Sequence, residues 1–181
     1  MAIVFSAMAL EAFINEMADI AAFPVPPGHF PLQHPSVPMV ADVLKELVDS
    51  YGAVQSKYLL AKRIFAGQPY DKGARPYQDF HLLIELRNTL IHIKHLDMTK
   101  HTPEGKEQSN EPSIIRKLAS KNVLADPGTP NLWIIRITTL ETARWACNTA
   151  AAMVRSLIDV IPDPNFKQRI EFGYRWHFSE V

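Results

Sequence analysis

The chain has 181 residues, of which 47% are hydrophobic, and its 19 basic and 19 acidic side chains give a formal net charge of zero. This length and hydrophobic content suit one ordinary core, so we expect a single domain over residues 1–181. The balanced charge lacks the basic excess of dedicated nucleic-acid binders, although it leaves room for an enzyme that contacts a few phosphates locally. The single cysteine, Cys147, excludes an internal disulfide and favours a reducing, cytoplasmic compartment. No segment has the roughly 20 uncharged apolar residues that cross a bilayer, so we expect no membrane association.

The first half of the chain predicts three helices. Apolar residues at helical spacing predict a helix over Ile3 to Ala22. The segment from Phe23 to Pro38 contains six prolines and predicts an extended connection. A second helical pattern runs from Met39 to Ala66, with Gly52 as the place where it bends. A third helix is predicted from Pro76 to Met98, because proline suits the first helical position.

The middle of the chain is less regular. The segment from His101 to Pro112 is polar and has no apolar anchor, so we expect it to be mobile. A short helix is predicted from Ser113 to Leu124. The β-branched and apolar residues from Trp133 to Ile137 predict a short extended segment, although no partner strand is evident.

The last long helix is introduced by a capping box. Thr138 and Glu141 have the spacing of such a box, and the apolar stripe that follows ends at Pro162. The tail over residues 165–181 is rich in aromatic side chains, which we expect to pack on the body or on a partner. The pattern as a whole predicts an all-α fold, a helical bundle of four to five main helices with a long proline-rich loop after the first.

Polar residues form one stripe along the predicted third helix. With about 3.6 residues per turn, the following side chains share a face: His81, Glu85, Asn88, His92 and His95. Arg87 lies beside this stripe, roughly 140° around the axis from His92. A single helix cannot close a site between the two, so a facing helix or a second copy of the chain would have to complete it.

Two segments together resemble the HEPN superfamily of helical-bundle proteins. The first is Ala-Leu-Glu-Ala-Phe-Ile-Asn-Glu at residues 9–16, and the second is Leu86-Arg87-Asn88 followed by His92. The superfamily signature is an Arg, usually followed by a polar residue, with a His a few residues further on; here four residues separate Arg87 from His92. The order of helices over about residues 1–160 also fits.

The resemblance implies an up-and-down bundle that forms a homodimer through the predicted third helix. It also implies, for active members, a metal-independent endoribonuclease without cofactors, of toxin–antitoxin or phage-defence type. His92 would accept the proton of a ribose 2′-hydroxyl, Arg87 would bind the phosphate and Asn88 would orient His92. The supporting residues would be Glu11, Asn15, Glu85 and His95. Some members partner an antitoxin that modifies a tyrosine two residues beyond the His, where this chain has Lys94.

An alternative interpretation gives the same residues a structural role. Arg87 would then pair with Glu11 or Glu85 at a helix interface, and the chain would be a non-catalytic dimeric module that binds a partner protein or a nucleotide. A histidine metal site is not predicted, since His92, His95 and His101 have no cysteine companion and no paired carboxylate at ligand spacing.

Overall fold

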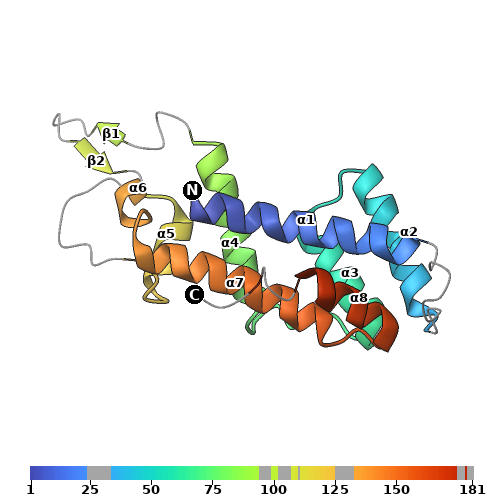
Figure 1. Ribbon diagram of the computed structural model, residues 1–181. Helices are drawn as coiled ribbons and strands as arrows, with labels where there is room; N and C mark the ends of the chain where they lie inside the picture. Colours follow the sequence, from blue (N-terminus) through green and yellow to red (C-terminus); the bar gives the residue numbers. More distant parts are fainter. Residues whose placement is uncertain are drawn as a thin grey trace.

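The computed structural model describes residues 1–23, 34–93, 111–124, 133–174 and 178, and the backbone of 99–101 and 107–109. The regular secondary structure of these residues is helical apart from one small hairpin, so the prediction of an all-α fold is confirmed (Figure 1). The helices are α1 (Ala2–Ala22), α2 (Ser36–Asp49), α3 (Val54–Ala66), α4 (Tyr77–Ile91), α5 (Ser113–Ala119), α6 (Trp133–Arg136), α7 (Leu140–Ile158) and α8 (Pro164–Tyr174). The strands β1 (Thr99–His101) and β2 (Glu107–Ser109) pair antiparallel. No described helix has both the length and the apolar character that a membrane span requires.

Helix α1 is the centre of the bundle. It packs against α2, α3, α4, α7 and α8, and its buried side chains belong to one core cluster that unites these helices. Leu10, Phe13, Ile14 and Met17 are fully buried on its inner face, as their helical spacing predicts. The first residues of α1 and of α7 line the same hollow, so the two long helices run side by side in the same direction (Figure 1).

The helix is interrupted at Gly52, where the sequence predicted only a bend. The helix α2 ends in a Schellman motif, in which Tyr51 has a φ of 55° and the Gly52 N–H donates to the Leu47 carbonyl over 2.6 Å. A side chain at Gly52 would meet Leu47 atoms at 2.8 and 2.9 Å. The predicted single helix is therefore two helices, α2 and α3, because the chain turns sharply at this close approach.

Helix α4 is shorter than predicted. It ends at Ile91, and His92 is its C-terminal cap rather than a helical residue. Thr, Ile and His near this end are weak helix formers, and Ile91 is half exposed and gains little from core packing. Residues 94–98, which include Lys94 and His95, lie outside the described residues.

Two of the predicted irregular segments contain regular structure. The segment from His101 to Pro112 contains strand β2 of the small hairpin; its expected mobility stays a prediction, and residues 102–106 and 110 lie outside the described residues. In the segment from Trp133 to Ile137, the first four residues form helix α6 rather than a strand, and Trp133 and Ile137, four residues apart, are both buried. A short apolar run does not by itself distinguish the two structures.

The C-terminal part of the chain consists of the capped helix α7 and an aromatic segment that packs on α1. The cap of α7 is Thr139, whose hydroxyl accepts from the Thr142 N–H, one residue later than predicted. Beyond α7 the chain folds back on α1: the rings of Tyr174 and Phe178 approach the edge of Phe13, with centroids 4.9 and 5.8 Å away. Trp176 lies outside the described residues.

Candidate functional site at the end of helix α4

Helix α4 divides its side chains between a buried and a polar face. Phe80, Leu83 and Leu86 are fully buried, and their spacing of three residues aims them at the core. His81, Asn88 and His92 are exposed on the opposite face, with Glu85 half exposed between them. The alternation of apolar and polar residues therefore presents the predicted stripe to solvent.

The last turn of α4 gathers three of the predicted site residues. The Arg87 guanidinium donates from Nη1 to the Asn88 side-chain oxygen over 3.0 Å, and this bond is exposed. The His92 backbone N–H donates to the Asn88 carbonyl over 3.0 Å. Asn88 thus holds the guanidinium toward the polar face. The prediction that Asn88 orients the His92 ring stays untested, since the recorded partner of its side chain is Arg87.

Arg87 differs from the other basic residues around α4 in its partner. Arg75 and Lys121 both contact the carboxylate of Asp79, at 2.9 and 2.6 Å. Lys117 contacts that of Glu85 at 2.9 Å. Within the described part of the chain, the side-chain partner of Arg87 is the neutral amide of Asn88. Its positive charge is therefore not neutralised by an acid there, and the alternative pairing with Glu85 is replaced by Lys117–Glu85.

The predicted supporting residues on α1 lie elsewhere. The Asn15 side-chain oxygen accepts from the Lys57 ammonium over 2.8 Å, and Lys57 is only 3% exposed. The Tyr58 hydroxyl donates to the Leu10 carbonyl, and its ring lies 5.0 Å from that of Phe80. This contact places the middle of α1 beside the first turn of α4.

Helix geometry separates these residues from the end of α4. Phe80 precedes His92 by twelve residues, which is about 18 Å of helix rise. The structure therefore does not bring Glu11 and Asn15 to His92, and among the described residues neither of them bonds to Arg87. His95 lies outside the described residues. Among the described residues, no group of three or more metal-ligating side chains gathers at one place.

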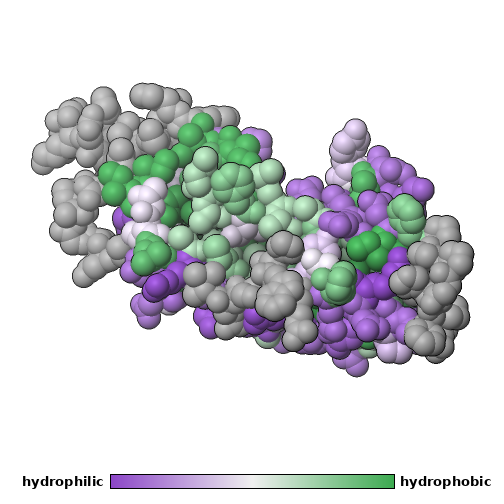
Figure 2. All heavy atoms as spheres, viewed as in Figure 1, coloured by the Kyte–Doolittle hydropathy of each residue, from purple (hydrophilic) through white to green (hydrophobic). Residues whose placement is uncertain are grey.

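Apolar side chains surround the end of α4. A hollow of about 430 Å³ is lined by residues of four helices, among them Met1, Val4, Leu90 and Ile134. Hydrophobic atoms cover this end of the molecule, where the start of α1 meets α4 and α6 (Figure 2). Three exposed residues each directly follow a residue that lines this hollow, and we call them the apolar patch: Phe5 of α1, Ile91 of α4 and Ile135 of α6. Sequence periodicity did not reveal it, because its members come from separate helices.

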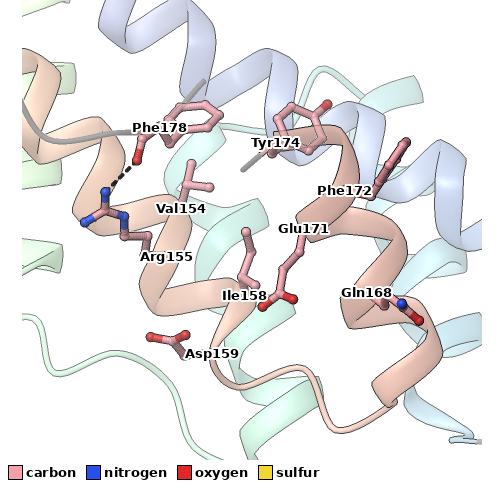
Figure 3. Close-up of a pocket in the computed structure, with 9 residues that line it drawn as sticks. All are labelled: Val154, Arg155, Ile158, Asp159, Gln168, Glu171, Phe172, Tyr174 and Phe178. Carbon is pink, nitrogen blue, oxygen red and sulfur yellow. Dashed lines mark hydrogen bonds between the residues drawn. The ribbon is translucent and has the colours of Figure 1, made fainter. Parts of the chain in front are cut away.

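A second hollow, of about 780 Å³, lies between α7 and α8 (Figure 3). Arg155 donates to the Phe178 carbonyl over 2.8 Å at one side, and Asp159 and Glu171 contribute carboxylates. Burial raises the pKa of Tyr174, which lines the same hollow. Arg155 lies twelve residues beyond Ala143 of the apolar hollow, about 18 Å along α7. This hollow is therefore separate from Arg87 and His92.

Comparisons with known proteins give no assignment. No family model matches the chain, and no curated protein or solved structure is significantly similar to it. The function is therefore argued from the residues at the end of α4.

Proposed function

We propose that the chain is a HEPN-type, metal-independent endoribonuclease in which Arg87 and His92 act on the scissile phosphate. The observation that carries this proposal is the solvent-exposed hydrogen bond between Arg87 and Asn88, one turn from an exposed His92. An arginine without a carboxylate partner retains its planar donor fork for a phosphate. A histidine at a helix end, open to solvent, is free to exchange a proton with a substrate.

The chemistry follows from these two side chains. His92 accepts the proton of a ribose 2′-hydroxyl, and the 2′-oxygen then bonds to the adjacent phosphorus. Arg87 stabilises the negative charge that accumulates on the phosphate oxygens. The bond to the 5′-oxygen breaks and that oxygen takes up a proton, which leaves a 2′,3′-cyclic phosphate on one product and a 5′-hydroxyl on the other. DNA lacks the attacking hydroxyl, which restricts the substrate to RNA.

A second copy of the chain completes the site. The departing 5′-oxygen needs a proton, and a twofold axis near α4 would bring a second His92 to supply it. The apolar patch supports this arrangement, because Ile91 is 49% exposed beside His92 and Phe5 is 56% exposed on α1. Exposed apolar side chains at one end of a molecule are typical of an interaction surface.

The test is cleavage of single-stranded RNA by the purified protein in EDTA. We expect a 2′,3′-cyclic phosphate product and no cleavage of a strand with a 2′-deoxyribose at the cut position. His92→Ala and Arg87→Ala should each slow cleavage by about 10²- to 10³-fold, as for loss of one oxyanion donor. Arg87→Lys should recover only part of the rate, since a point charge does not replace the bidentate fork.

The matched control is Arg63→Ala, which removes an exposed arginine from α3 and should leave the rate unchanged. Melting curves of all variants should stay close to that of the wild type, because the bond between Arg87 and Asn88 is exposed. Equal cleavage by wild type, Arg87→Ala and His92→Ala would show a contaminating nuclease and would overturn the proposal.

The apolar patch also favours a second candidate function, a non-catalytic dimeric module that binds a partner protein. In that case no RNA cleavage depends on Arg87 or His92, whereas Phe5→Glu abolishes partner binding. The two candidates therefore differ in which residues their activities require.

A further inference from the structure

A basic pocket lies between α4, α5 and the turn that precedes α4. It has a volume of about 380 Å³, and its lining includes Lys72, His81, Lys117 and Lys121. Lys72 and His81 are exposed, and Lys121 also donates to the Gln78 side chain over 2.7 Å. The pocket is thus open to solvent and rich in hydrogen-bond donors.

The acids near the pocket do not cancel its charge. Asp79 accepts from Arg75 and Lys121, and Glu85 accepts from Lys117. Lys72 has no hydrogen-bond or ion-pair partner among the residues that the structure describes. The lining itself contains three lysines and no carboxylate. With Arg75 added, four permanently basic side chains face the three carboxylates of Asp71, Asp79 and Glu85, which leaves one positive charge without counting His81. A locally positive pocket attracts anions even though the whole chain is neutral.

The pocket lies on the same face of α4 as the candidate nuclease site. His81 and Asn88 are seven residues apart, about two turns, which is a rise of about 10 Å. Lys121 lies opposite Gln78 and Lys117 lies opposite Glu85, so α5 runs antiparallel beside this face. One polar face thus leads from the pocket to the exposed Arg87–Asn88 pair.

We propose that this pocket binds a backbone phosphate of the RNA strand that is cut at Arg87 and His92, a few nucleotides from the scissile bond. The inference rests on the proposed function and adds to it a second anchoring point. Lysine ammonium groups contact phosphates without reading bases, so the pocket holds the strand in place and does not select its sequence. A polynucleotide is favoured over an acidic peptide because a strand can place phosphates at the pocket and at the Arg87 fork together.

The experiment measures binding of a labelled single-stranded RNA to a His92→Ala background, in which cleavage is suppressed. Lys72→Glu should weaken binding by about tenfold or more, whereas Lys45→Glu, the same change at an exposed lysine of α2, should have little effect. With Lys72→Gln, the slope of log K against log salt should become shallower by about 0.7, the value for one lost phosphate contact on a single strand. Lys121 is left intact because its loss would remove one of the two cationic partners of the buried Asp79.

The outcomes separate this inference from the proposed function. Suppose that the wild-type protein cleaves RNA as proposed, and that Lys72→Glu and Lys45→Glu bind RNA equally well. This result would overturn the assignment of the pocket and leave the proposed nuclease standing. If the wild-type protein does not cleave RNA but Lys72→Glu selectively weakens RNA binding, the nuclease proposal is overturned and the pocket remains a polynucleotide-binding site. Absence of RNA binding, or equally good competition by polyglutamate of the same charge, would overturn the assignment of the pocket to a nucleic acid.

Discussion

At the scale of single residues, the partner of a side chain decides what it is available to do. Arg75 precedes α4 and Arg87 lies within it, but Arg75 contacts the carboxylate of Asp79 while Arg87 contacts the neutral amide of Asn88. A charged partner offsets the charge of a guanidinium, whereas an amide oxygen only orients it. The same distinction applies to Lys57, which is buried and directed at Asn15.

Tyr70 carries a prediction about alkaline pH. Burial raises its pKa to about 12, despite the opposing effect of the hydrogen bond between Tyr70 and Ser156. In the unfolded chain the phenol ionises near its ordinary pKa of about 10, so stability is complete below that pH and is lost as the pH rises toward about 12. A pKa shift of this size corresponds to a loss of about 2 to 3 kcal/mol in the free energy of unfolding once the pH exceeds both pKa values.

The measurement is urea unfolding at neutral pH and at about pH 11. We expect Tyr70→Phe to lose about 0.5 to 1.5 kcal/mol at neutral pH, for the bond to Ser156, and to lose less stability than the wild type on going to high pH. Tyr51→Phe, at an exposed site, should leave the pH dependence unchanged. Identical pH dependence in the Tyr70→Phe protein would contradict the burial argument.

At the scale of the elements, helix ends are set by close approaches as much as by propensity. The helix α2 ends where Gly52 passes against Leu47, and α3 ends at Gly67, whose φ is 72°. A residue with a β-carbon is disfavoured at each, at Gly52 by a clash and at Gly67 by the left-handed backbone.

Gly52→Ala should therefore destabilise the protein. The new methyl group would lie 2.8 Å from the Leu47 side chain and 2.9 Å from its carbonyl oxygen, so the turn must shift at a cost of about 1 to 3 kcal/mol. Gly173→Ala is the matched control, since a β-carbon there meets nothing within 4 Å and α8 gains up to about 1 kcal/mol of helix propensity. Urea midpoints measure both; equal midpoints for the two variants would show that α2 and α3 tolerate a looser turn.

At the scale of the whole molecule, some of the exposed apolar residues lie at the end that carries the candidate site. Phe5 and Ile91 belong to the apolar patch beside His92, whereas Phe172 is 89% exposed on α8, beside the hollow between α7 and α8. If the patch buries itself against a second copy, removing its apolar character should separate the copies.

Sedimentation tests this arrangement. The wild-type protein should sediment at about twice the 20.4 kDa chain mass, and Phe5→Glu should sediment as a single chain with an unchanged far-UV spectrum. Phe172→Glu makes the same change outside the patch and should leave the dimer intact. A wild-type monomer at micromolar concentration, or a dimer that only Phe172→Glu disrupts, would rule out the composite site at α4.

The sequence by itself determined the helical class, the buried face of α1 and the polar stripe of α4, because each depends on spacing within one helix. It did not determine where the helices end: the break at Gly52 and the end of α4 at Ile91 depend on what each residue meets after packing. Only the tertiary structure decided the partners of the charged residues. Lys117 and Glu85 are thirty-two residues apart in the chain and meet because α5 folds beside α4. The Asn15 side chain accepts a hydrogen bond from Lys57 of α3 rather than from Arg87. Spacing specifies a face, but only packing specifies which faces meet.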